Sequence, residues 1–228
     1  MLRSHLLLAL AVLLVACEDE LVVPDIDTLM KLENLGSEDL PSDGISTTTF
    51  RVVLDAATDT SIKEVEFTTT RGTFSGSTTY LANIRSDRTA EALLTAGREP
   101  GACTVTAKVA TLTVAHNLAF VYAKPDLLQL DLSMYVTDTT SSAAITVTTL
   151  ATRMIGQPSA GQTVWFSFAP DTASTGLVLP AAASIGSNGQ ATATLTNPFM
   201  HAGLYTISAR MLGGSGDTLL SQRTLLFQ

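Results

Sequence analysis

The sequence predicts an all-β protein in which two sandwiches follow one another after about residue 44. Three observations predict this fold. From there on, the chain is rich in Thr, Val, Ala, Leu and Ser and shows almost no helical periodicity. Short segments of alternating apolar and polar residues are separated by Gly, Asn and Asp, which favour turns. The same series of segments occurs twice, each time over about 100 residues, as expected for a small sandwich.

The first 16 residues have the composition of a secretory signal. Arg3 gives a positive start, and residues 6–15 form an unbroken apolar run. This run is too short to cross a bilayer, which takes about 20 apolar residues. It ends in Leu14-Val15-Ala16-Cys17, and Glu18-Asp19-Glu20 follows at once. Residues 1–16 are therefore predicted to be a signal peptide that is cleaved.

Leu14-Val15-Ala16-Cys17 resembles the lipobox of bacterial lipoproteins. The resemblance implies cleavage before Cys17, a diacylglycerol on its sulfur and a further acyl chain, such as palmitate, on its new amine. The membrane is then a partner through the lipid anchor. Each buried methylene contributes about 0.8 kcal/mol, so two or three chains hold far more firmly than one. The alternative is an ordinary secretory peptide with a chance cysteine, because cleavage sites favour small residues.

Residues 17–43 are expected to form an acidic tether. They hold nine Asp and Glu residues, opposed only by Lys31, and like charges extend a linker. The acids directly after Cys17 resemble the export signal of Bacteroidetes-type lipoproteins. That resemblance implies the outer membrane, with the cell surface favoured over the periplasmic face. The alternative is that a solvated linker simply begins with acids.

The strands expected after the tether fall into two sets. They are residues 47–54, 64–69, 89–94, 103–109, 118–122, 128–135, 143–149, 162–168, 191–196, 204–210 and 224–227. Residues 44–124 and 125–228 are then predicted to be two immunoglobulin-like sandwiches in tandem. A start near residue 22 is the alternative for the first one. Pro125 ends a short, stiffened linker, because proline cannot continue a strand in register.

The two halves also match residue by residue. Val65-Glu66-Phe67 corresponds to Val164-Trp165-Phe166, residues 86–93 to 187–194, and residues 101–107 to 203–209. The ordered set resembles the group 1 bacterial immunoglobulin-like domains of the invasin and intimin adhesins. The first copy departs from that pattern at Arg88, where a turn glycine is expected, and at Cys103, where an aromatic residue is expected. In that family such domains serve as stalks or spacers.

Composition excludes several classes of function. The chain carries a formal net charge of −8, and cleavage would leave 12 basic against 21 acidic side chains, without a basic cluster. This argues against a nucleic-acid partner. His116 and His201 are far apart and lack ligand partners at metal spacing, and no phosphate-binding or nucleophile motif occurs. We therefore expect no catalytic residue, metal or cofactor. Cys103 is expected to be a small buried hydrophobe rather than a reactive thiol.

Trp165 is the candidate contact residue. Alternation that buries Val164 and Phe166 turns Trp165 to the opposite face, at the position that Glu66 holds in the first copy. The alternative is that a neighbouring loop or the other domain covers it, since large aromatic side chains are usually buried.

These observations predict a non-enzymatic, lipid-anchored envelope protein for adhesion, recognition or scaffolding. Its partner would be another envelope protein or a glycan. The alternative is a polysaccharide-binding accessory module of an outer-membrane machine, with Trp165 as the platform. A hydrolase ranks third, because it would need clustered carboxylates or His116 beside an acid.

Overall fold

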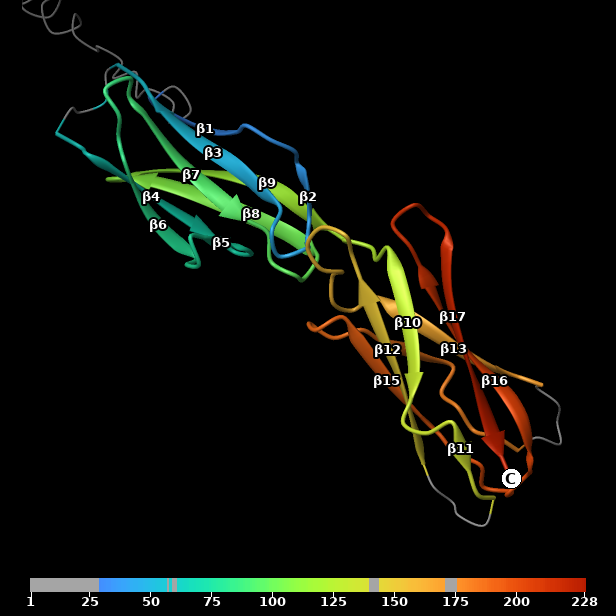
Figure 1. Ribbon diagram of the computed structural model, residues 1–228. Coiled ribbons are helices and arrows are strands. Elements are labelled where there is room, and N and C mark those ends of the chain that lie inside the picture. The colour runs from blue at the N-terminus through green and yellow to red at the C-terminus, as the bar shows by residue number, and fades with distance from the viewer. Residues whose placement is uncertain (1–28, 57, 59–60, 140–143, 171–175) are drawn as a thin grey trace, which may run out of the picture.

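The computed structural model describes residues 29–56, 58, 61–139, 144–170 and 176–228, and these residues form strands joined by turns (Figure 1). The strands are β1 (Met30–Asn34), β2 (Asp39–Pro41), β3 (Thr47–Leu54), β4 (Glu64–Thr69), β5 (Thr73–Phe74), β6 (Thr79–Asn83), β7 (Thr89–Thr95), β8 (Gly101–Val109), β9 (Leu112–Val121), β10 (Leu127–Leu132), β11 (Val136–Thr137), β12 (Ile145–Thr152), β13 (Thr163–Ala169), β14 (Ala182–Ser184), β15 (Gln190–Leu195), β16 (Gly203–Leu212) and β17 (Thr218–Phe227). Within the described residues, no helix has the length and apolar character needed to cross a membrane.

Four sheets pack in pairs around two separate cores. Sheets β1-β3-β7-β5 and β2-β9-β8-β4-β6 enclose a core that includes Phe50, Phe67 and Leu94. Sheets β10-β12-β15 and β11-β17-β16-β13-β14 enclose a second core that includes Leu130 and Ile207. The two sandwiches lie end to end, so the molecule is elongated (Figure 1). The predicted all-β fold is confirmed.

Strand alternation explains which side chains enter each core. On β8, Cys103, Val105, Ala107 and Val109 are buried while the residues between them are more exposed. Cys103 is 1% exposed, and its Sγ lies 3.3 Å from Thr69 Oγ1. The expectation of a buried, hydrophobe-like cysteine is confirmed.

The structure differs from the expected tether of residues 17–43. Met30–Asn34 and Asp39–Pro41 are strands of the first sandwich, because Met30 and Leu40 are buried in its core. On these two strands, Glu33 and Asp39 occupy positions that leave their side chains at least partly exposed. The acidic composition of this segment suggested a linker, and for that reason the sequence did not predict these two short edge strands. Residues 17–28, including Cys17, lie outside the described residues.

The two sandwiches share details that sequence matching does not show. A short parallel strand adds to the last strand in each: β2 pairs with β9, and β11 pairs with β17. Just after each short strand, one residue donates both its backbone N–H and its side-chain hydroxyl to a carbonyl oxygen at the end of the last strand. Ser42 does so to Val121, and Thr139 does so to Gln228. Ser42 and Thr139 are therefore structural equivalents.

The turn before β7 and β15 shows how the repeat diverges. Gly189 has φ 76°, as expected for its turn, and the equivalent Arg88 adopts φ 63° despite its side chain. Such a left-handed conformation costs a residue with a Cβ roughly 1–2 kcal/mol. Arg88 Nη1 donates to the carbonyl oxygens of Asp55 and Thr58, which helps to hold it there.

A hydrogen-bonded joint connects the sandwiches. Ser42 and Ser159 are fully buried, and their Oγ atoms lie 2.6 Å apart. Ser159 Oγ also accepts a hydrogen bond from the Ala123 N–H at 2.8 Å. Arg98 donates from Nη2 to the carbonyl of Pro158 at 2.8 Å. These bonds connect three segments of the first sandwich and the linker to the loop at Pro158 and Ser159. They therefore restrain both the orientation and the spacing of the two sandwiches.

Candidate functional site

Trp165 lies on the outer face of the sheet β11-β17-β16-β13-β14. Its neighbours on β13, Val164 and Phe166, are buried, whereas Trp165 is 43% exposed. In the register, Trp165 stands between Ala182 on β14 and Arg210 on β16. The predicted outward orientation is confirmed, and any covering of the indole is partial.

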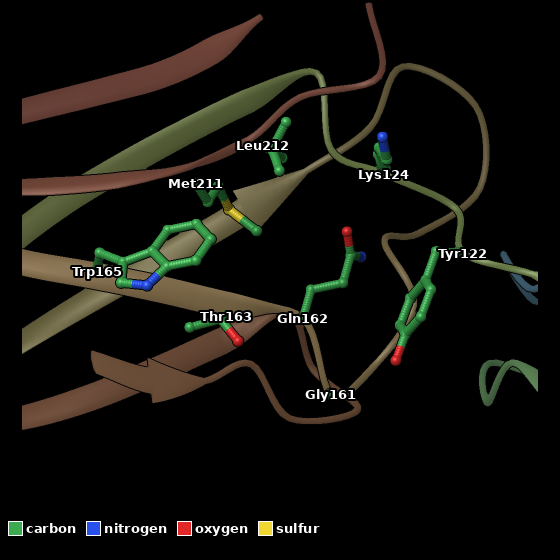
Figure 2. Close-up of a pocket in the computed structure, with 8 residues that line it drawn as sticks. All are labelled: Tyr122, Lys124, Gly161, Gln162, Thr163, Trp165, Met211 and Leu212. Carbon is green, nitrogen blue, oxygen red and sulfur yellow. The ribbon is translucent and has the colours of Figure 1, made fainter. Parts of the chain in front are cut away.

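A shallow groove of about 220 Å³ runs from Trp165 toward the joint. Figure 2 shows Trp165 and Tyr122 at its two ends, with Gln162 between them. Met211 and Leu212 form one apolar side beside the indole, and Lys124 lies on the linker side. A second hollow of about 400 Å³ shares Trp165, Met211 and Leu212 with the groove and is also lined by Arg210.

Gln162 lines the groove, and two hydrogen bonds hold its side chain in place. Its Nε2 donates to the carbonyl oxygens of Ala123, at 3.0 Å, and Ser159, at 2.9 Å. Because both acceptors belong to the joint, the groove and the joint form one hydrogen-bonded unit. The sequence offers no periodic signal for this arrangement, since Tyr122 and Lys124 come from the linker and Trp165 from β13.

The charge of this region differs from that of the chain. Lys124 lines the first hollow and Arg210 the second, and among the described residues no carboxylate lines either of them. The chain as a whole carries a net charge of −8. The hollows therefore suit a ligand that combines apolar or ring surface with negative charge.

The first sandwich provides an internal comparison for this face. The register of β8 with β9 pairs Ala102 with Ala119, Thr104 with Asn117, Thr106 with Ala115 and Lys108 with Thr113. The same register of β16 with β17 pairs Leu204 with Leu226, Thr206 with Thr224, Ser208 with Gln222 and Arg210 with Leu220. From the first sandwich to the second, three of these positions change from Ala or Thr to Leu. One position keeps a cationic side chain, Lys108 in the first and Arg210 in the second. Glu66 is replaced by Trp165 on the adjoining strand. At these positions the outer face of the second sandwich is the more apolar one, although Leu81 stands beside Glu66 where Ala182 stands beside Trp165.

His116 is brought beside an acid, as a hydrolase would require. Its Nε2 lies 2.9 Å from Glu38 Oε2, and its ring contacts Phe50 edge-on at 5.5 Å. Glu38 belongs to the connection between β1 and β2, so this hydrogen bond ties the connection to β9. Within the described residues, no group of three or more His, Cys, Asp or Glu side chains is arranged to hold a metal ion.

No protein-family model and no curated protein matches the chain. Solved structures do resemble it. The adhesin InvE of Yersinia pseudotuberculosis superposes with a TM-score of 0.62 at 17% identity, over 88% of this chain and 59% of InvE. Invasin, a bacterial integrin-binding protein, superposes with a TM-score of 0.59 at 20% identity, over 87% of this chain and 39% of invasin. The chain thus spans less than two thirds of either structure. It has the immunoglobulin-like β-sandwich fold of these proteins.

Proposed function

We propose that the protein is a non-enzymatic, lipid-anchored envelope protein that serves adhesion or recognition at the bacterial surface. The anchor is Cys17 in the outer membrane, and residues 18–29 form the tether. One immunoglobulin-like domain then extends from Met30 to Lys124 and a second from Pro125 to Gln228. The lipobox-like segment supports the anchor, and the fold shared with InvE and invasin supports the role.

One observation carries the recognition role. Around Trp165, the outer face combines exposed apolar side chains with Arg210, whereas the equivalent positions of β8 and β9 in the first sandwich are mostly small or polar in an identical register. Packing within the sandwich does not require this difference, because both outer faces point away from their cores. Large exposed apolar surfaces commonly mark interaction sites. The second sandwich is therefore the contact domain, and the first is a spacer.

The joint supports this division of roles. A contact domain at the end of a stalk is presented in a fixed direction only if the stalk does not bend freely. The buried pair of Ser42 and Ser159, with the bond from Arg98 to Pro158, supplies that restraint.

A polysaccharide partner is the second candidate. Trp165 and Tyr122 offer two aromatic surfaces at the ends of one groove, and Lys124 adds a cation. Aromatic faces and a nearby cation suit a chain of acidic sugars, because the rings pack on apolar sugar faces while the amine pairs with carboxylates. Affinity electrophoresis through gels containing neutral or acidic polysaccharides tests this directly, with retardation expected only in the acidic gels.

The proposed recognition role is tested by exchanging equivalent residues between the sandwiches. Beads coated with the purified chain are presented to cultured animal cells, to bacterial cells and to glycan arrays. We expect Trp165→Glu, which installs the first copy's residue, to reduce retention at least tenfold on the surface that holds wild type. Glu66→Ala, the matched change on the spacer, should leave retention unchanged. Equal retention of wild type and Trp165→Glu on every surface would contradict the proposal.

A further inference from the structure

A third hollow, which we call the joint hollow, lies where the two sandwiches meet. Its volume is about 720 Å³, and it shares no lining residue with the two hollows beside Trp165. Two arginines line it, Arg71 and Arg98, together with three hydroxyl side chains, those of Thr70, Thr78 and Ser187. Ser187 belongs to the second sandwich and the other four residues to the first. Clefts of this size commonly hold small ligands.

Arg98 reaches the joint with most of its hydrogen-bonding capacity unused. Its Nη2 donates to the carbonyl of Pro158 at 2.8 Å and is the only guanidinium nitrogen of Arg98 that bonds to another described residue. Its Nε is buried without a partner among those residues. Burial lowers the pKa of Arg98, and no carboxylate of the described residues forms an ion pair with it. A desolvated cation without a counter-ion in the chain is stabilised by an anion from outside.

Arg71 is positioned on the same hollow by two features of the backbone. Its Nε donates to the carbonyl of Ala102 at 3.1 Å. Its guanidinium lies against Gly101, where an added Cβ would be 3.2 Å from the guanidinium carbon. Glu99 also lines the hollow, with its Oε2 3.7 Å from Arg71 Nη1 and its side chain 82% exposed. So long and exposed an ion pair contributes little, and an incoming anion can therefore replace Glu99.

The internal repeat shows that the sandwich fold does not require a cation at Arg98. Residues 101–107 correspond to 203–209, and counting back from that match aligns Arg98 with Met200. In the second sandwich, the residue at this position before the strand is thus uncharged. The arginine is specific to the end of the first sandwich that forms the joint.

We propose that the joint hollow binds an acidic sugar unit, whose carboxylate pairs with Arg98 and Arg71. The guanidinium fork matches a carboxylate in shape and charge. The hydroxyls of Thr70, Thr78 and Ser187 suit those of a sugar ring, because each can both donate and accept a hydrogen bond. A bare anion would leave these hydroxyls and most of the volume unused. A sugar bound to residues of both sandwiches would also hold them together.

Titration of the purified full chain carrying Cys17→Ser with glucuronate, followed by nuclear magnetic resonance, tests the site. We expect saturable chemical-shift changes with a dissociation constant of about 1 mM, as for a small ligand with few contacts. Glucose has the same hydroxyl-bearing ring without the carboxylate and should bind at least tenfold more weakly. Inorganic phosphate should also bind at least tenfold more weakly, because it cannot use the hydroxyl side chains of the hollow as a sugar ring does.

Four variants locate the bound ligand. Arg98→Gln and Arg71→Gln should each weaken glucuronate binding at least tenfold. Glu99→Gln should strengthen it about twofold, because it removes the carboxylate that competes for Arg71. Arg223→Gln is the matched control, since Arg223 is exposed on β17 and does not line the hollow, and it should bind like wild type. Circular dichroism shows whether each variant keeps the fold, and Arg71→Gln carries the test if loss of the bond to Pro158 disturbs the joint.

Three results would overturn the inference. One is the absence of saturable glucuronate binding below about 50 mM. Another is binding that Arg98→Gln and Arg71→Gln leave unchanged, which would place the ligand elsewhere. The third is phosphate binding as tight as that of glucuronate, which would make the hollow a general anion site. None of them bears on the proposed recognition role, which is tested with Trp165→Glu at residues that the joint hollow does not share.

Discussion

The Oγ atoms of Ser42 and Ser159 lie 2.6 Å apart, and both side chains are fully buried between the two sandwiches. The two residues are 117 positions apart in the sequence. A buried hydroxyl pair thus joins the end of one immunoglobulin-like sandwich to the first loops of the next.

Ser159→Ala should weaken the joint. It removes the hydroxyl that accepts from the buried N–H of Ala123 and donates to the carbonyl of Ser42, at a cost of about 1–3 kcal/mol. We expect a lower melting temperature by calorimetry and a broader distribution of interdomain angles by small-angle X-ray scattering. Ser167→Ala, at an exposed position on β13, should change neither. A scattering profile identical to wild type would show that the orientation does not depend on this hydroxyl.

Low pH should destabilise the turn that follows Ser42, because the carboxyl of Asp43 accepts hydrogen bonds there from Ile45 and Ser46. Burial raises the pKa of this carboxyl, but hydrogen bonds from Ile45 and Ser46, with the charge of Arg153, lower it by more, so its pKa lies below the ordinary aspartate value. A lowered pKa stabilises the fold above about pH 4, and this stability is lost as the pH falls further. Melting temperatures measured from pH 7 to pH 3 should therefore fall more steeply for wild type than for Asp43→Asn. Parallel curves would assign the acid sensitivity to other groups.

Gly189→Ala should destabilise the second sandwich by about 2 kcal/mol or more. Gly189 has φ 76°, and an added Cβ would lie 2.7 Å from the carbonyl oxygen of Ala151. Arg88→Gly at the equivalent turn should change stability by less than about 1 kcal/mol, because relief of strain is offset by lost hydrogen bonds and a freer unfolded chain. Urea denaturation of both variants measures the difference. Equal effects would contradict the account, because they would show that the second turn does not specifically require glycine.

Cys103 should be inert in the folded protein. Its side chain is 1% exposed, so a thiol reagent reaches it only when the first sandwich opens. In the Cys17→Ser chain, Cys103 is the only thiol. Labelling should then be at least a hundredfold slower in buffer than in denaturant. Fast labelling in buffer would show that strand β8 opens readily.

Trp165 is the only tryptophan of the chain, so its fluorescence reports on the groove alone. Because Trp165 is 43% exposed, acrylamide should quench its fluorescence efficiently. A bound partner should reduce quenching and shift the emission to shorter wavelength, and Tyr122→Ala should weaken that response. Emission that is unchanged by a partner bound with wild-type affinity would place the contact elsewhere.

Strand alternation made much of this fold predictable. It located β3, β4 and β7 almost to the residue, and it placed Trp165 outward and Cys103 inward. It missed β1 and β2, because these strands are short and lie among acidic residues that suggest a linker. It also began β9 too late, since His116 and Asn117 interrupt its apolar pattern.

The groove and the joint were not predictable in the same way. Both depend on residues from the linker, from loops and from β13, and their approach is set by how two sandwiches meet. Ser42 and Ser159 carry no local signal, because serine is common in solvated turns. The repeat did contain usable information, since aligning the strands residue by residue exposes the change from Glu66 to Trp165.

Protease treatment of intact cells tests the central claim, which is display of a lipid-anchored recognition protein at the cell surface. Wild type and Cys17→Ser are compared with a protease that cannot cross the outer membrane, before and after lysis. The account predicts that wild type is digested on intact cells, and that Cys17→Ser leaves the membrane fraction. Wild type that is protected until lysis, or a variant that stays bound to the membrane, would contradict it.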